Sequence, residues 1–136
     1  MADSFKLQMG RILRKVDGRA NTLLRATALE TLSRIVQRTP VDTGRARGGW
    51  EVAIDATPPD SSDVDASGGA TIARAAAVIT GAKAGSSIVI RNSVPYINML
   101  EYGGHSPQAP AGMVRITVQE IRSIVDRAAA KAKREG

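Results

Sequence analysis

The hydrophobic pattern of this chain is dominated by two long amphipathic segments, one near each end. Over residues 4–38, apolar side chains recur at spacings of three and four, which predicts a helix with one buried face. Pro40 ends this helix, because a proline disfavours helical geometry in the residue before it. Residues 111–133 show the same spacing and finish in lysines and arginines, which the dipole at a helix C-terminus favours.

The first predicted helix is too long for a compact domain of this size. About 35 residues at about 1.5 Å each give a rod of roughly 52 Å. A compact domain of 136 residues has a diameter of roughly 37 Å. Two outcomes stay open: the helix breaks at Asp17-Gly18, or its apolar face extends past the domain and another subunit covers it.

Shorter elements are expected between the two helices, since stretches with the period of a half-buried strand alternate with stretches of helical spacing. In chain order these predict a strand over 48–56, a short helix over 70–81, a strand over 86–91 and a short helix over 95–102. The fold class is therefore α+β in one domain spanning residues 1–136, with the long N-terminal and C-terminal helices packed on a small, mostly antiparallel β-sheet.

Residues 57–69 have almost nothing to bury, which predicts a long exposed acidic loop that stays flexible unless something outside the domain orders it. Its aspartates lack the central glycine and distal glutamate of a calcium loop, so we expect no metal there.

Composition supports a folded core and limits the chemistry. Apolar residues make up 43% of the chain and aromatic residues only 3%, so the core is mainly aliphatic. The absence of cysteine removes disulfides and thiolate chemistry. No apolar run approaches the roughly 20 residues that span a bilayer, so we expect no membrane partner.

The net charge of +6 is unevenly distributed along the chain. Residues 1–50 carry ten Lys and Arg against four Asp and Glu, residues 51–110 carry three against six, and residues 111–136 carry six against three. Basic ends and an acidic middle suit head-to-tail packing between copies as well as they suit nucleic acid. The basic first helix of one copy against the acidic middle of the next is therefore a candidate contact.

An enzyme needs a converging set of titratable groups, and the sequence predicts none. The only histidine, His105, lies in a Gly/Pro loop, and its pairing with Glu101 lacks a nucleophile or metal partner. We therefore expect neither catalysis nor a cofactor. Glu101 itself is interpreted either as a structural carboxylate that binds backbone N–H groups or Arg91, or as a contact between subunits.

The glycine-rich turn that holds Arg45 and Arg47 resembles a phosphate-binding loop only loosely, since it lacks the Lys-Ser/Thr pair of such loops. Its arginines are expected to be solvated or paired with carboxylates of a neighbouring chain. Contact with a phosphate backbone stays an alternative.

An ordered set of short motifs points to a known family. The motifs are Pro40-Val-Asp-Thr-Gly44, Gly49-Trp50 at the start of a strand, Asn92-Ser-Val-Pro-Tyr96, Leu100-Glu-Tyr-Gly-Gly104 and Ala109-Pro-Ala-Gly-Met113. Over roughly residues 30–125, their order and spacing resemble the neck and tail-completion (head–tail joining) proteins of tailed bacteriophages.

The resemblance implies a structural virion protein, made in the host cytoplasm, that forms a ring around the DNA channel at the head–tail neck. Its partners would be copies of itself, a tail terminator or tail tube protein, and connector-side neck proteins, with non-specific proximity to genomic DNA. Six copies would suit a ring on the tail end and twelve a ring on the connector. No enzyme activity and no cofactor are implied.

The resemblance assigns structural or interface roles to the matching positions Asp42, Thr43, Gly44, Trp50, Asn92, Pro95, Tyr96, Glu101, Gly103 and Gly104, and Arg45 and Arg47 of the adjoining turn join them as interface candidates. The main alternative is a small basic nucleic-acid-binding protein, favoured by a pI of about 10.3. Few aromatic residues are present to stack on bases, which counts against it.

Overall fold

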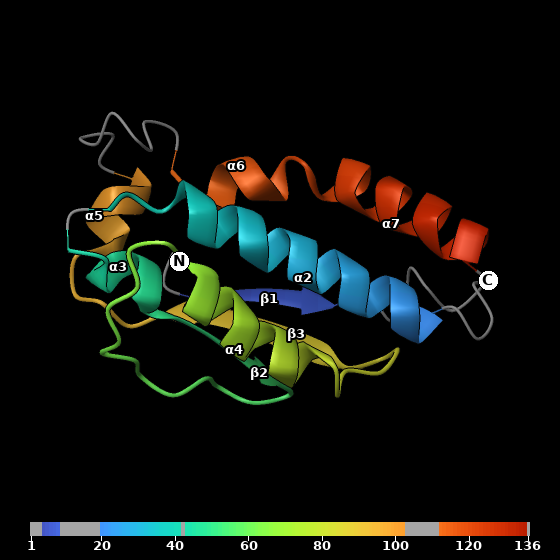
Figure 1. Ribbon diagram of the computed structural model, residues 1–136, viewed down its shortest axis with the longest axis horizontal. Helices are drawn as coiled ribbons and strands as arrows, with labels where there is room; N and C mark the ends of the chain where they lie inside the picture. The colour runs from blue at the N-terminus through green and yellow to red at the C-terminus, as the bar shows by residue number, and fades with distance from the viewer. Residues whose placement is uncertain (1–3, 9–19, 42, 103–111, 136) are drawn as a thin grey trace.

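The computed structural model shows a small antiparallel sheet covered on one face by helices α2 and α4, with α6 and α7 packed along α2 (Figure 1). The described residues are 4–8, 20–41, 43–102 and 112–135. In chain order the elements are β1 (Ser4–Gln8), α2 (Ala20–Arg38), α3 (Arg45–Gly48), β2 (Trp50–Ile54), α4 (Gly69–Ile79), β3 (Ser87–Asn92), α5 (Ile97–Tyr102), α6 (Val114–Val118) and α7 (Ile121–Glu135). This is the α+β class that the sequence predicts.

Strand β3 is the centre of the sheet, whose order is β1-β3-β2 with both pairings antiparallel. Trp50 of β2 lies opposite Asn92 of β3, and Val52 lies opposite Ile90. Val52, Ile88 and Ile90 are buried, because the alternation along each strand turns these side chains toward the core. The β-branched run of the sequence thus forms the central strand.

Helix α2 supplies the largest part of the core. Its buried apolar side chains recur every three or four residues and are Ala20, Leu23, Leu24, Ala28, Leu32, Ile35 and Val36. Each buried leucine, isoleucine or valine among them contributes about 1.5–3 kcal/mol. The same cluster includes Trp50, Ile79 of α4 and Met113 before α6, so it joins the sheet to both helical layers.

The helix predicted over 4–38 is wrong at its beginning, because Ser4–Gln8 form the edge strand β1. Phe5 and Leu7 alternate with polar neighbours, which fits a strand, and they also belong to the spacing of three and four that fits a helix. The backbone pairing with β3 decides for the strand. Residues 9–19, including the possible break at Gly18, lie outside the described residues. Helix α2 has 19 residues and is about 28 Å long, which fits within the domain.

The single helix predicted over 111–133 is also wrong, because the structure has two helices separated at Gln119 and Glu120. The turn brings Glu120 against Arg34 and Arg38 of α2, a long-range contact that the local pattern does not contain. Residue 111 lies outside the described residues.

The remaining predicted bounds differ from the structure by a few residues. The predicted strand 48–56 is shorter, because α3 precedes it and Asp55, with a φ of 54°, follows its last residue. The short helices and the second strand lie where the sequence predicts them, at α4, α5 and β3. Among the described residues, no helix combines the length and the apolar character that crossing a bilayer requires.

Candidate assembly surface

The structure divides the predicted site residues into two groups. Thr43, Gly44, Arg45, Arg47, Trp50 and Asn92 come together where α2 ends and β2 begins, a region called here the corner. Pro95, Tyr96 and Glu101 lie at α5, beyond the end of β3. Asp42, Gly103, Gly104 and His105 lie outside the described residues.

The corner is held by buried polar bonds. The indole Nε1 of Trp50 donates to Oγ1 of Thr39 at 2.8 Å, and that hydroxyl donates to the carbonyl of Ile35 at 2.7 Å. Asn92, which is fully buried, donates to the carbonyl of Ala46 at 2.7 Å and accepts from the N–H of Val94 at 3.0 Å. Trp50 and Asn92 therefore stabilise the corner from inside and present no surface to a partner.

Arg47 connects the corner to the acidic loop. Its guanidinium donates to the carbonyls of Gln37 (3.1 Å) and Thr39 (2.9 Å), which close the end of α2, and to the carbonyl of Ala66 (2.9 Å). These bonds satisfy carbonyls that a helix end leaves without a helical partner. Arg47 is thus engaged within the chain, whereas Arg45 is exposed.

Gly44 permits the close approach of the loop at this corner. Its φ is 92°, and a Cβ there would lie 2.7 Å from the backbone nitrogen of Ala66. The carbonyl of Gly44 accepts hydrogen bonds from the N–H groups of Gly48 (2.9 Å) and Asp65 (3.0 Å). A side chain at position 44 would separate the turn from the loop.

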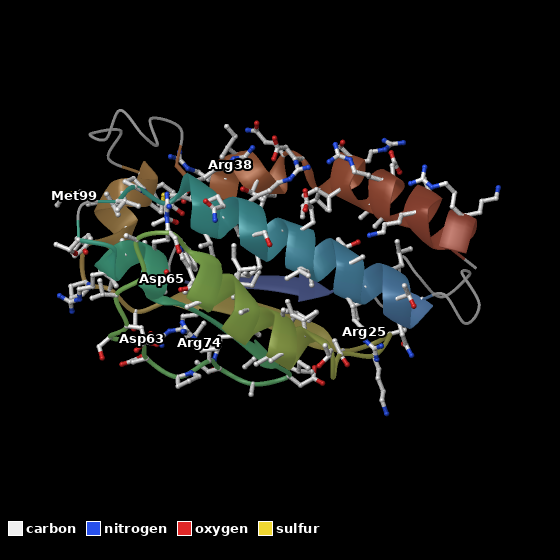
Figure 2. All side chains as sticks on the ribbon, in the orientation of Figure 1. Arg25, Arg38, Asp63, Asp65, Arg74 and Met99 are labelled. Carbon is white, nitrogen blue, oxygen red and sulfur yellow. The ribbon has the colours of Figure 1, made fainter. Side chains whose placement is uncertain are left out.

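The acidic loop is bound by arginines of the chain itself, contacts that its sequence did not predict. Asp60 pairs with Arg91 of β3 (Oδ1 to Nη1, 2.5 Å), and Asp63 pairs with Arg74 of α4 (Oδ2 to Nη1, 3.0 Å). The Nε of Arg74 also lies 2.8 Å from a carboxylate oxygen of Glu51 on β2. The loop therefore lies against the corner, α4 and β3 (Figure 2).

Asp65 of the same loop caps helix α4. One carboxylate oxygen accepts the N–H of Thr71 at 2.8 Å, and the other accepts the N–H of Gly68 at 3.1 Å. These bonds, led by the one from Thr71, lower the pKa of Asp65 because they stabilise the ionised carboxylate.

Glu101 joins α5 to α6. Its fully buried carboxylate accepts the backbone N–H groups of Met113 (2.9 Å), Val114 (2.8 Å) and Arg115 (3.0 Å), and the Nε of Arg115 also donates to it at 3.0 Å. Burial alone would raise the pKa of Glu101, but these four donors outweigh it and the pKa is lowered. Of the two sequence interpretations, the structure shows the contacts of a structural carboxylate, with Arg115 in the place proposed for Arg91.

Glu120 joins the turn between α6 and α7 to α2. Arg38 donates to both carboxylate oxygens (2.6 and 2.9 Å), and Arg34 donates to one at 3.0 Å. The hydrogen bonds from Arg38, with those from Arg34, lower the pKa of Glu120 to about 2.

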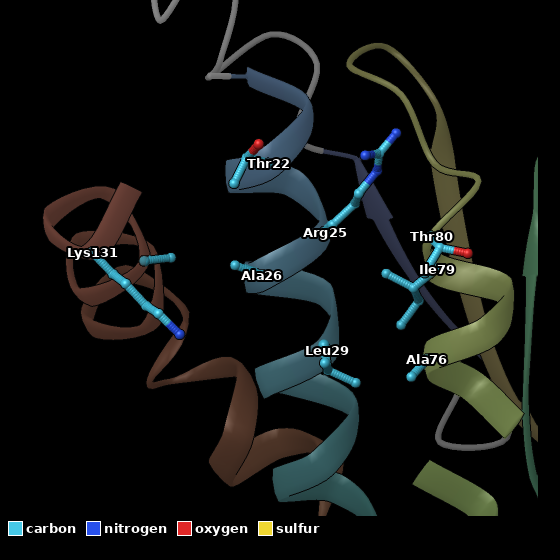
Figure 3. Close-up of a pocket in the computed structure, with 9 residues that line it drawn as sticks. Thr22, Arg25, Ala26, Leu29, Ala76, Ile79, Thr80 and Lys131 are labelled. Carbon is cyan, nitrogen blue, oxygen red and sulfur yellow. The ribbon is translucent and has the colours of Figure 1, made fainter. Parts of the chain in front are cut away.

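Among the described residues, the surface carries two exposed apolar features. Large exposed side chains lie on the loop, on α5 with the residue before it, and on α6: Val64, Tyr96, Met99, Tyr102 and Val118. A groove of about 340 Å³ lies between α2, α4 and α7. Thr22, Ala26 and Leu29 form its α2 side, with Ala76 and Ile79 opposite on α4 (Figure 3).

The carboxylates of Asp65, Glu101 and Glu120 are thus engaged in capping and in internal ion pairs. In the part of the chain that the structure describes, no group of three or more His, Asp or Glu side chains is placed to hold a metal ion.

A family model described as "Bacteriophage HK97-gp10, putative tail-component" matches residues 3–103, about three quarters of the chain. The chain belongs to this HK97-gp10-like family. It is therefore a component of a bacteriophage tail, consistent with the phage resemblance of its motifs. No curated protein and no solved structure matches the chain significantly.

The family match runs from just before β1 to just after α5, so it includes the corner, the acidic loop and Glu101. It ends before α6 and α7. The donors that Glu101 binds, and the α7 side of the groove, therefore lie in the part of this chain beyond the matched residues.

Sequence reasoning missed three residues that hold these surfaces together: Arg74, Asp65 and Glu120. Asp65 carried a usable signal, since an aspartate shortly before an alanine-rich helix is typical of a cap. Arg74 and Glu120 had no local sequence signal, because their partners Asp63 and Arg38 lie 11 and 82 positions away along the chain.

Proposed function

We propose that this tail component is a ring-forming structural protein of the head–tail junction, which completes the tail end or joins it to the connector and surrounds the DNA channel. The observation that carries the proposal is membership of the tail-component family over residues 3–103, combined with motifs that resemble neck and tail-completion proteins.

The distribution of contacts supports a role in assembly without catalysis. Glu101, Glu120 and Asp65, whose pKa values are lowered, all bind N–H groups or guanidinium groups within the chain. Apolar features also stay exposed: the groove, Val64 and the side chains at α5. The proposed partners are further copies of this chain, a tail terminator or tail tube protein and connector-side neck proteins.

Labelling of particles tests this placement. Phage carrying an affinity tag at the C-terminus of this chain should bind gold-conjugated ligand at the neck, seen by electron microscopy. A null mutant should accumulate DNA-filled heads separate from tails. Gold along the tail shaft or at its distal tip would contradict the junction while leaving the chain a tail component.

The exposed cations of α7 favour one second candidate, contact with nucleic acid. Arg122, Lys131, Lys133 and Arg134 are all exposed on this helix. Such a face would bind phosphates without sequence preference, and salt would weaken the binding steeply. Tight, salt-sensitive binding of short duplex DNA by the monomer in a gel-shift experiment would support this candidate, and its absence at low salt would exclude it.

A further inference from the structure

The groove between α2, α4 and α7 is apolar with a cationic rim. Its walls carry mainly methyl groups, and of the nine lining residues the two charged ones, Arg25 and Lys131, are both cations (Figure 3). Arg25 is fixed there, because its Nε donates to the carbonyl of Ala82 at 2.7 Å. An occupant that suits this groove has an apolar side chain flanked by carboxylates.

The same chain carries a segment of that chemistry. Val64 is 64% exposed and lies between Asp63 and Asp65 in the acidic loop. The side chains of Asp60 and Asp63 keep 77% and 64% of their surface exposed, although each pairs through one oxygen with an arginine. Each carboxylate therefore has a second oxygen available to a further cation.

We propose that residues 60–66 of one copy dock in the α2–α4–α7 groove of the next copy, with Val64 among the methyl groups and Asp60 and Asp63 facing Arg25 and Lys131. This contact rests on the proposed ring function and names the two surfaces that meet in it. It explains why an exposed valine lies in a loop that three internal arginines already fix. A loop held in its bound shape loses less conformational entropy on docking.

The two surfaces lie on different parts of the molecule. Asp63 and Asp65 lie toward the α3 and α5 end, whereas Arg25 lies toward the opposite end of the long axis (Figure 2). A contact between unlike surfaces is heterologous, so each copy offers a groove to one neighbour and a loop to the other. Such a contact closes into a ring when the rotation between copies allows it.

The apolar side chains at α5 are the competing occupant, and charge disfavours them. The one acidic residue of α5 is Glu101, which is fully buried. The guanidinium of Arg115 lies 4.8 Å from the ring centroid of Tyr102, so docking there would bring a third cation to Arg25 and Lys131. Like charges placed together oppose association.

Disulfide cross-linking of the full chain tests the contact directly, since the natural sequence has no cysteine. The double variant Val64→Cys, Ala26→Cys should give a ladder of covalent oligomers after mild oxidation. A mixture of the two single variants should give covalent dimers only. Ser123→Cys with Ala26→Cys is the matched control and should give no ladder, because Ser123 is exposed on α7 and is not among the residues that line the groove.

Light scattering on the unmodified chain separates this contact from the ring itself. Oligomers together with the predicted ladder support both proposals. Oligomers without the ladder, or a ladder from Met99→Cys with Ala26→Cys instead, overturn the loop-in-groove contact and leave the ring. At about 1 mM protein, even an association free energy of only about 4 kcal/mol would give oligomers. A chain that is still monomeric at this concentration overturns both the loop-in-groove contact and the ring.

A second variant measures the energetic part of the proposal. Val64→Asp should raise the dissociation constant of the oligomer at least about tenfold, because it places a charge among methyl groups. Val118→Asp, the same change at another exposed valine, is the control and should leave the constant within about twofold. Equal effects of the two variants would overturn the contact.

Discussion

Several charged side chains in this protein bind backbone groups where one element meets the next. Glu101 reaches three N–H groups at the start of α6, Asp65 reaches two at the start of α4, and Arg47 reaches two carbonyls at the end of α2. A buried donor or acceptor left without its partner costs about 1–3 kcal/mol. Each of these residues therefore stabilises the junction between two elements rather than one element alone.

Gly112 offers the sharpest residue-scale prediction, because it lies against the carboxylate of Glu101. A Cβ at this position would lie 2.4 Å from Oε2 of Glu101, and the φ of Gly112 is 84°. Gly85 has a φ of 95°, but a Cβ added there would meet no atom within 4 Å, so it is a matched control. We expect Gly85→Ala to lower the free energy of unfolding by about 1 kcal/mol, because alanine is strained at a positive φ. Gly112→Ala should lower it by at least about 2 kcal/mol more, because the added Cβ separates Glu101 from its hydrogen-bond donors.

Urea denaturation of the two variants measures this difference in the free energy of unfolding. Equal losses for Gly112→Ala and Gly85→Ala would contradict the role assigned to Glu101 in joining α5 to α6.

Among single residues, the sequence indicates which positions matter more readily than what they contact. Glu101 is singled out by its place before two glycines, and binding to backbone N–H groups is one of its two interpretations. That the donors belong to residues 113–115 depends on how α5 and α6 meet, which no local pattern encodes. Trp50 and Asn92 are likewise found as motif residues, but their burial follows from the register between β2 and β3.

At the scale of elements, helix α2 is connected to its neighbours by ion pairs as well as by its apolar face. Glu120 in the turn before α7 accepts from Arg34 and Arg38, and the ordinary pKa of this carboxyl, 4.5, falls to about 2 in the fold. The unfolded chain therefore binds the proton more readily than the folded chain between these two values. The stability that Glu120 contributes is complete above about pH 5 and is lost as the pH falls toward 2.

Glu120→Gln tests this pH dependence. At pH 7 the variant should unfold about 1 kcal/mol more easily than the wild type, a modest loss because the pair is partly solvated. The difference should shrink as the pH falls from 6 to 2.5, since the wild-type carboxyl becomes neutral as well. Chemical denaturation at several pH values measures it, with the exposed Asp126→Asn as control. A difference that stays constant with pH would count against the ion pairs.

The acidic loop gives a second prediction at this scale. Arg74 binds Asp63 and Glu51 and also donates to the carbonyls of Gly48 and Trp50 at 3.3 Å. Arg74→Met should allow the loop to detach locally. A loss of about 1–2 kcal/mol in the free energy of this opening raises the population with a detached loop by a factor of about 5–30. Cleavage by a protease that cuts before aspartate should therefore be faster in the loop by about that factor.

Arg45→Met is the control for this experiment, because Arg45 is an exposed arginine of the neighbouring helix α3. The same cleavage rate in wild type and Arg74→Met would show that the loop is held by other contacts.

The elements that the sequence predicts best are those with strong local signals. β3 follows from its β-branched run, and α4 from alanine-rich helical spacing. β1 could not be found, because its five residues fit both periods and only pairing with β3, about 80 positions away, selects the strand. The break between α6 and α7 could not be predicted for the same reason, because the contacts of Glu120 with Arg34 and Arg38 span 86 and 82 positions.

At the scale of the whole molecule, the internal ion pairs change which charges are available to a neighbour. The sequence places an acidic middle between basic ends, but Arg74 and Arg91 already pair with the loop carboxylates Asp63 and Asp60. The attraction between copies is therefore local, between the rim cations of the groove and the second oxygens of Asp60 and Asp63. The core of the contact is apolar, and salt does not screen that part.

This balance predicts a limited dependence of assembly on salt. Exposed charge pairs are screened over about 10 Å at 0.1 M salt. Raising the salt from about 0.05 to about 0.5 M should therefore weaken the oligomer several-fold without abolishing it.

Lys131→Gln, which removes one rim cation from the groove, should weaken the oligomer at low salt and flatten the salt dependence, whereas Lys133→Gln on the same helix should change neither. Sedimentation velocity at several salt concentrations measures the dissociation constants. An oligomer whose dissociation constant is independent of salt, or a Lys131→Gln variant that follows the wild-type curve, would show that the cations around the groove do not face carboxylates of a neighbouring copy.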